Sequence, residues 1–139
     1  FEGTMVSVGR GTDKPFRQFG YPGMPNTKYS FTPQSIKGVS DNPPYKGEVC
    51  NGYNVSDYGE VFMKYNKQLY LFWILNAYKS CPAKDKFIND YFLKLTGTDK
   101  LKQQITEGKT EEEIRKSWEP DLVKFKLVRK KYLLYKDFE

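Results

Sequence analysis

The chain opens with FEGTMVSVGRGTDKPF, residues 1–16, which joins a strand-like stretch to a glycine-rich turn. Residues 4–8 alternate in the manner of a β-strand. Gly9 and Gly11 follow, and because glycine adopts positive φ without steric cost, they predict a tight turn that lets the backbone approach a ligand closely. Arg10 stands between them. We therefore expect its guanidinium to be held on a turn, where it can bind a carboxylate or phosphate through two hydrogen bonds.

The turn has a simpler interpretation that stays open. Gly-x-Gly turns after strands are common, and an arginine on such a turn is often only solvated. The dinucleotide pattern Gly-x-Gly-x-x-Gly is not met because position 14 is Lys, and no Gly-Lys-Ser/Thr sequence follows. We therefore do not expect a nucleotide site.

Several further segments occur in a fixed order along the chain. They are SFTP at 30–33, YKGEVCNG at 45–52, LTGTD at 95–99, SW at 117–118 with DL at 121–122, and RKKYLLY at 129–135. Together with residues 1–16, they resemble the C-terminal domain of the NamZ-type exo-β-N-acetylmuramidases. These bacterial glycoside hydrolases remove N-acetylmuramic acid from the non-reducing ends of peptidoglycan fragments. The resemblance covers essentially the whole chain.

The resemblance implies that residues 1–139 form one C-terminal domain of a larger two-domain protein. The principal catalytic Glu then belongs to an N-terminal Rossmann-like domain outside this chain, and the active site lies in the cleft between the two domains. This domain would form one wall of that cleft, and we expect it to be inactive alone. Its expected partners are the N-terminal domain and a muropeptide or peptidoglycan-derived sugar.

Five residues are candidates for binding that sugar: Glu2, Ser7, Arg10, Thr12 and Lys46. Muramic acid differs from its neighbour sugar by a lactyl carboxylate, which an arginine such as Arg10 reads directly. Glu2 is a possible supporting carboxylate at the domain junction, or an acid that pairs with the turn. Ser7 and Thr12 can bond sugar hydroxyls or hold the turn, and Lys46 can face the cleft or the solvent.

Two positions depart from the family pattern. Met5 stands where the family usually has Asn, and Tyr21-Pro22-Gly23 stands where it tends to have Ala-Pro-Trp. If these positions line the sugar site, its polarity and its stacking surface differ from the usual pattern.

Composition limits the chemistry that this chain can perform. With no His among its 139 residues, it offers no histidine acid–base catalysis and no histidine metal ligands. Two cysteines cannot make a zinc site, so we expect neither a metal nor a cofactor. Cys50 and Cys81 could form one disulfide or remain buried thiols.

The net charge of +6 favours an anionic partner. Nucleic acid is not expected, because no recognition helix, RNP-like motif or zinc finger accompanies the charge. A binding module for an anionic glycan or other polyanion, without turnover, is the alternative function, and a purely structural cap is a third possibility.

The longest strongly apolar run, residues 69–75, is too short to span a membrane. From the substrate that the resemblance implies, we expect the protein in the cell envelope, periplasmic or secreted.

The periodicity predicts an α+β fold, with a small, mostly antiparallel sheet in the N-terminal half backed by a helical C-terminal half. Strands are expected at residues 4–8, 28–31 and 48–55. A buried central helix is expected at 66–78, a second helix at 87–95 with a Gly97 cap, and a short one stopped by Gly108.

The C-terminal part of the chain predicts two further helical segments. Thr110 with Glu113 forms a capping-box pattern at the start of the first. Pro120 is expected to break that helix or to fall in the first turn of the next. The last helix carries an apolar stripe made by Leu122, Phe125, Val128 and Tyr132.

Overall fold

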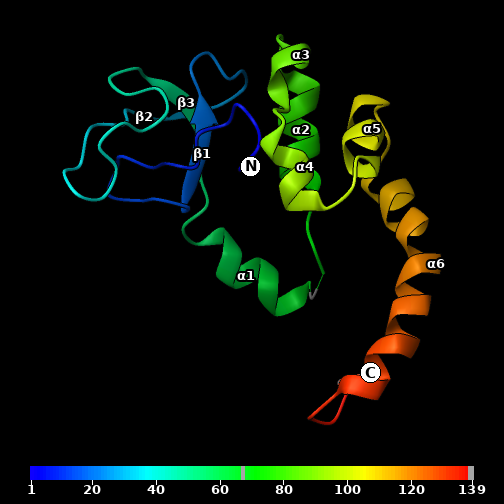
Figure 1. Ribbon diagram of the computed structural model, residues 1–139. Coiled ribbons are helices and arrows are strands. Elements are labelled where there is room, and N and C mark those ends of the chain that lie inside the picture. The colour runs from blue at the N-terminus through cyan, green and yellow to red at the C-terminus, as the bar shows by residue number, and fades with distance from the viewer. Residues whose placement is uncertain (67, 138–139) are drawn as a thin grey trace.

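The computed structural model describes residues 1–66 and 68–137 and confirms the α+β class (Figure 1). A three-stranded sheet lies on one side, and helices α2, α3 and α4 pack beside it. Helices α5 and α6 lie farther out. The elements are β1 (Gln18–Tyr21), β2 (Tyr29–Phe31), β3 (Cys50–Asn54), α1 (Tyr58–Tyr65), α2 (Phe72–Ser80), α3 (Lys84–Phe87), α4 (Tyr91–Thr96), α5 (Lys100–Thr106), α6 (Glu111–Arg129) and the 3₁₀ turn η1 (Lys130–Tyr132).

The sheet is antiparallel, as predicted, and its strand order is β1-β3-β2. Strands β2 and β3 correspond to the strands expected at 28–31 and 48–55, whereas β1 was not predicted. Gly20 pairs with Gly52 across β1 and β3. A Cβ atom on Gly52 would lie 1.9 Å from the carbonyl oxygen of Phe19. The two strands therefore approach each other at a point where only glycine fits.

Residues 4–8 do not form the predicted strand; they form a strap between the sheet and the helices. Ser7 pairs with Gly20 of β1, whereas Thr4 pairs with Ile88 beyond α3. The Met5 N–H donates to the Phe87 carbonyl oxygen at 2.9 Å. The segment changes partners after every few residues, so its alternating pattern produces two isolated bridges and no ladder.

The predicted helix at 66–78 is wrong at its start, and residue 67 lies outside the described residues. Helix α2 begins only at Phe72, and α1 occupies residues that the sequence interpretation left unassigned. Leu69 is 64% exposed between the two helices, and Phe72 is 44% exposed. The apolar run is thus split between a linker and a helix that buries only part of its surface.

The later helices follow the sequence more closely. The predicted helix at 87–95 is divided into α3 and α4, and Gly97 ends α4 in the left-handed conformation, as expected. The Thr110 capping box is confirmed, since the Glu113 N–H donates to Thr110 Oγ1 and the Glu113 carboxylate accepts from the Thr110 N–H.

Pro120 does not end α6, contrary to the prediction. The helix runs from Glu111 to Arg129 with Pro120 inside it. A proline removes one backbone donor, which leaves the carbonyl of Lys116 without its helical partner. Both Pro120 and Lys116 are exposed, so water can hydrate that carbonyl. Exposure therefore explains why the helix continues.

The hydrophobic core lies between the sheet and the helices. The strap, β1, α2 and α4 all contribute to it. Its buried members are Val6, Phe19, Tyr21, Met24, Ala77, Cys81, Phe87, Ile88, Phe92 and Ile105. The strap is thus anchored on both sides, which fixes the turn that follows it.

Within the described residues, no helix combines the length and apolarity needed to cross a membrane.

Candidate functional site

The glycine turn after the strap has the conformation that the sequence predicted. Gly9 and Gly11 have φ of 78° and 81°. A Cβ atom on Gly11 would lie 2.5 Å from the carbonyl oxygen of Gln34 and from Pro43 Cγ. The Gly11 carbonyl also accepts a 2.7 Å hydrogen bond from the Gln34 N–H. This close packing holds the turn in place and fixes the position of Arg10.

Arg10 is oriented by two neighbours. Its Nη2 atom donates to Glu2 Oε1 at 2.5 Å, and its guanidinium carbon lies 5.4 Å from the centre of the Phe16 ring. The Arg10 and Glu2 side chains are 51% and 44% exposed. A guanidinium has five N–H donors, so one contact with Glu2 leaves others available to a ligand. The structure therefore shows that Glu2 pairs with Arg10, while half of the arginine side chain still faces solvent.

Arg10 and Glu2 lie at a pocket of about 250 Å³, which we call the N-terminal pocket. Residues of the strap form most of its wall. It is lined by Phe1, Glu2, Gly3, Thr4, Val6, Ser7, Val8, Arg10, Pro44 and Tyr91. The structure thus brings together three of the five candidates: Glu2, Ser7 and Arg10.

Ser7 and Thr12 both stabilise the turn. Ser7 is 2% exposed, and its Oγ accepts a 3.3 Å hydrogen bond from the Gly9 N–H. The Thr12 hydroxyl donates to the Gly9 carbonyl at 2.6 Å and lies 2.6 Å from Gln18 Nε2, which donates to it. It also accepts from the Lys14 N–H at 3.1 Å. Thr12 does not line the N-terminal pocket, and these contacts occupy its hydroxyl.

Lys46 is exposed and does not line the N-terminal pocket. It belongs to a turn in which Tyr45 has φ of 58° and Gly47 has φ of 80°. The neighbouring Tyr45 is fixed to the strap, because its hydroxyl donates to the Met5 carbonyl at 2.7 Å. Lys46 is therefore close in sequence to the pocket residue Pro44, but its own side chain does not line the pocket.

Tyr91 and Pro44 are pocket residues that the sequence interpretation missed. Tyr91 is the first residue of α4 and is 53% exposed, whereas its neighbour Phe92 is 4% exposed. Both fitted the apolar repeat of residues 87–95, and periodicity alone does not separate the buried member from the exposed one. An aromatic ring at the edge of a pocket offers a flat surface for stacking against a sugar.

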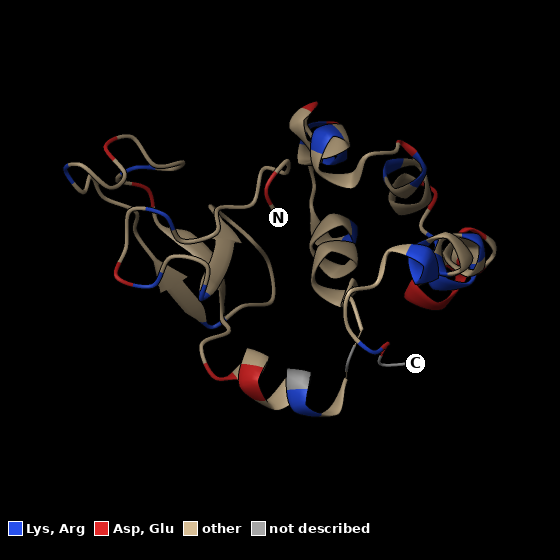
Figure 2. Cartoon of the chain, turned by 60° about the horizontal axis from the view of Figure 1, so that its bottom comes forward, with Lys and Arg blue, Asp and Glu red and all other residues tan. Residues whose placement is uncertain are grey.

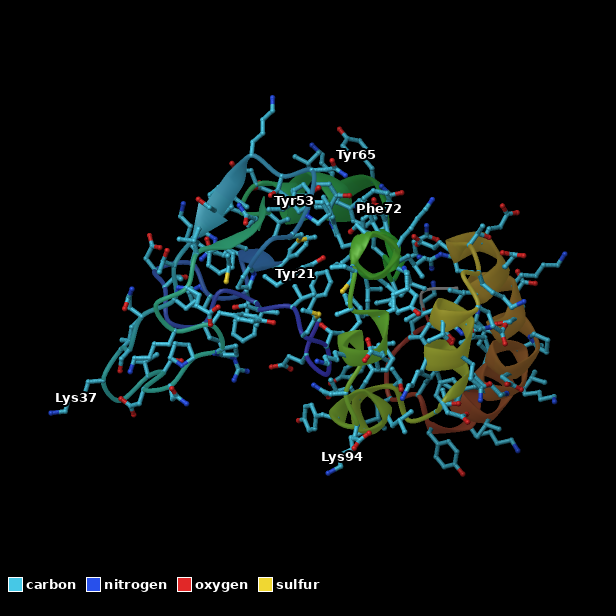
Figure 3. The ribbon with its side chains drawn as sticks, turned by 90° about the horizontal axis from the view of Figure 1, so that it is seen from above. Tyr21, Lys37, Tyr53, Tyr65, Phe72 and Lys94 are labelled. Carbon is cyan, nitrogen blue, oxygen red and sulfur yellow. The ribbon has the colours of Figure 1, made fainter. Side chains whose placement is uncertain are left out.

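The two departures from the family pattern lie outside the N-terminal pocket. Met5 packs against the core, with its Sδ 3.5 Å from Cys81 Sγ. Tyr21 is buried in the interior between the sheet and α2 (Figure 3), and its hydroxyl lies close to the same thiol. Burial raises the pKa of Tyr21 to about 12. Both residues thus pack in the core around Cys81 and do not line the N-terminal pocket.

Cys50 and Cys81 are both buried and are not bonded to each other, which decides between the two states that the sequence left open. Burial raises the pKa of the Cys50 thiol to about 11. A thiol with that pKa stays protonated near neutral pH and is a poor nucleophile. These cysteines therefore contribute to packing.

The fold and the site thus define the class of protein. It is an α+β domain in which an N-terminal turn carries an arginine beside a pocket. A sequence model of the family described as "Exo-beta-N-acetylmuramidase NamZ, C-terminal" matches residues 1–135. The chain belongs to this family of NamZ C-terminal domains.

Two relatives illustrate this membership. The chain is 31% identical to the peptidoglycan beta-N-acetylmuramidase NamZ of Bacillus subtilis (strain 168) over 147 residues, covering 96% of this chain and 35% of that protein. It is also similar to the crystal structure of a DUF1343 family protein from Bacteroides fragilis NCTC 9343. That structure is 42% identical with a TM-score of 0.87, covering 99% of this chain and 38% of the other. The chain spans little more than a third of either relative.

Proposed function

We propose that this domain is the C-terminal lobe of an exo-acting β-N-acetylmuramidase that releases N-acetylmuramic acid from the non-reducing ends of peptidoglycan fragments. The observation that carries the proposal is Arg10, which Glu2 orients at the N-terminal pocket while half of its side chain stays exposed. The family membership and the activity for which the Bacillus relative is named support the same reaction.

In this proposal Arg10 binds the lactyl carboxylate of N-acetylmuramic acid. The remaining guanidinium donors match a carboxylate in charge and in planar geometry. Glu2 fixes the plane of the guanidinium before the substrate arrives, and Tyr91 supplies a stacking surface for the sugar ring. Ser7 holds the backbone of the turn from below.

The reaction itself needs a second protein surface. Glycoside hydrolysis generally uses two carboxyl groups that flank the scissile bond. Glu2 is the carboxylate that lines the N-terminal pocket, and its oxygen is engaged with Arg10. We therefore assign the principal catalytic Glu to the N-terminal domain and give Glu2 a supporting role. With a volume of about 250 Å³, the pocket is small for a complete ligand site and suits one wall of an interdomain cleft.

The test compares two chromogenic β-glycosides, one of N-acetylmuramic acid and one of N-acetylglucosamine. Each is offered to the full-length protein and to this chain alone. We expect the full-length protein to release only the muramic acid product and the isolated chain to release nothing. If the full-length protein hydrolyses neither glycoside but binds anionic glycans, the alternative function of a binding module without turnover takes its place.

A further inference from the structure

Helix α6 carries an apolar stripe that begins in the core and continues onto the surface. Ile114, Trp118 and Leu122 are spaced four residues apart, so their side chains lie on one face of the helix. Ile114 is fully buried and Trp118 is partly buried. Beyond Pro120 the same face continues with Leu122, Phe125 and Val128, which are 48%, 60% and 52% exposed. We call these three residues the α6 stripe.

A hollow of about 540 Å³ lies between α1 and the first half of α6. Phe62 and Tyr70 line one side of it, and the charged residues Glu111, Glu112, Arg115, Lys116 and Glu119 of α6 line the other. The outer surface of α1 exposes Val61 and Tyr65 at 61% and 74%. Helix α1 and the C-terminal end of α6 extend to the same side of the molecule, beyond α2 (Figure 1). Exposed apolar residues gathered along one helix face mark an interaction site.

The first half of α6 is held to the rest of this chain: Gln104 Nε2 donates to Ser117 Oγ at 2.8 Å, and Lys100 pairs with Asp121 at 3.8 Å. Among its described residues, Ile114 alone is buried. Past Pro120, the bond between Arg129 and Asp137 joins residues of the same C-terminal segment. No residue of α6 beyond Pro120 is buried, so this half of the helix lacks the packed apolar face from which most helices in proteins gain their stability.

A longer protein keeps the same arrangement. The Bacteroides fragilis crystal structure matches 99% of this chain at a TM-score of 0.87, and this chain accounts for only 38% of it. The remaining part of such a protein is large enough to cover the exposed α6 stripe.

We propose that the α6 stripe and the neighbouring outer surface of α1 form the docking surface for the domain that precedes this one in the longer family proteins. Figure 2 shows that basic and acidic residues are mixed over the helices of the C-terminal half as a whole. Residues 122–136 hold six Lys and Arg residues and no Asp or Glu. The matching surface is therefore an apolar patch bordered by carboxylates. This inference rests on the family membership and not on the proposed reaction, so either can fail without the other.

The test uses the full-length protein and hydrogen exchange resolved by peptide. We expect amides of residues 121–129 to be protected in the wild type and to exchange at least tenfold faster in Phe125→Asp. Peptides of β1 and β3 should stay protected in the same variant, which shows that the domain is still folded. The matched control is Val39→Asp, because Val39 is 80% exposed on the loop that Ile36 and Ser40 close. It should leave exchange in α6 unchanged.

Three results would overturn the proposal. The first is exchange in α6 that is as fast in the wild type as in Phe125→Asp. The second is a dimer of the full-length protein, seen by sedimentation, that Phe125→Asp dissociates, which would assign the surface to a second copy. The third is binding of the full-length protein to vesicles of phosphatidylglycerol and phosphatidylcholine that Phe125→Asp abolishes, which would assign it to an anionic membrane.

Discussion

At the scale of single residues, the open question is whether Glu2 orients Arg10 for substrate binding or takes part in the chemical step. Their side chains meet at 2.5 Å at the edge of the N-terminal pocket. A carboxylate that orients an arginine acts on substrate binding, whereas a carboxylate that transfers a proton acts on the chemical step. Kinetics therefore separate the two roles.

We expect Glu2→Gln to raise KM for the muramic acid glycoside several-fold in the full-length protein while kcat stays within about threefold of the wild type. The amide keeps a hydrogen-bond acceptor for Arg10 but loses the charge that fixes the guanidinium. Steady-state kinetics at fixed pH provide the measurement. A fall of kcat by two orders of magnitude with KM unchanged would instead make Glu2 a catalytic carboxylate.

The sequence predicted the turn well and the pocket only in part. Gly9 and Gly11 were predicted from the conformational freedom of glycine, which is a local property, and both have positive φ. Tyr91 and Pro44 were missed because they reach the pocket through tertiary contacts between segments that lie far apart in sequence. Lys46 was proposed from its place after a proline-rich loop, a signal that does not determine where a long side chain points.

At the scale of the elements, the sheet depends on its paired glycines. A Cβ atom on Gly52 would collide with the backbone of β1 at 1.9 Å. We expect Gly52→Ala to lower the free energy of unfolding by more than about 3 kcal/mol, since backbone atoms cannot move aside as a side chain can. Soluble yield and the circular dichroism spectrum report the effect.

Gly59 provides the matched control for that substitution. It lies in α1, its φ is not in the left-handed region, and a Cβ atom there would meet nothing within 4 Å. We expect Gly59→Ala to be neutral or to stabilise the protein by about 0.5–1 kcal/mol, because alanine favours the helix. Equal loss of soluble protein in both variants would contradict the packing argument for Gly52.

The capping box at the start of α6 predicts a local effect on helix opening. Thr110 Oγ1 accepts a 3.2 Å hydrogen bond from the Glu113 N–H. We expect Thr110→Ala to weaken the first turn by about 1 kcal/mol, which makes its amides exchange about fivefold faster. Hydrogen exchange of the peptide that follows Thr110 measures this. An unchanged rate would mean that tertiary contacts, such as the burial of Ile114, hold the turn without the cap.

The same capping box gives the helix a pH dependence. Hydrogen bonds from the backbone N–H and the hydroxyl of Thr110 lower the pKa of Glu113 below its usual 4.5. A carboxylate with a lowered pKa in the folded state stabilises that state above its unfolded pKa, and this contribution disappears as the pH falls through the folded pKa. Amides of the first turn should therefore be better protected in the wild type than in Glu113→Gln well above pH 4.5, and this difference should shrink as the pH is lowered below that value. A difference that stays constant as the pH falls would contradict this.

Element boundaries show where local signals compete with the tertiary structure. The capping box was predictable because four consecutive residues contain the whole motif. The strap was predicted as a strand, since its alternation is real, but its partners lie in β1 and after α3, and no local pattern specifies them. Pro120 remains inside α6 because the carbonyl it leaves unpaired is exposed, a fact that only the three-dimensional structure provides.

At the scale of the whole molecule, the α+β class followed from the change in periodicity between the two halves of the chain. The apolar stripe of the last helix was also predicted, but the surface that it packs against was not. Apolar residues spaced three and four apart show which side of a helix is apolar, and they do not show whether the same chain covers that side. Here the chain covers Ile114 and leaves Phe125 exposed.

The most direct measurement is the ratio of kcat/KM for the muramic acid glycoside to kcat/KM for the N-acetylglucosamine glycoside, in the full-length protein and in Arg10→Ala. The account predicts that the ratio falls about tenfold or more in Arg10→Ala, since a hydrogen bond to a charged group contributes about 1.5–3 kcal/mol. Arg17→Ala, which removes an exposed arginine outside the N-terminal pocket, should leave it unchanged. A ratio that Arg10→Ala leaves at the wild-type value would contradict the binding of the lactyl carboxylate by Arg10.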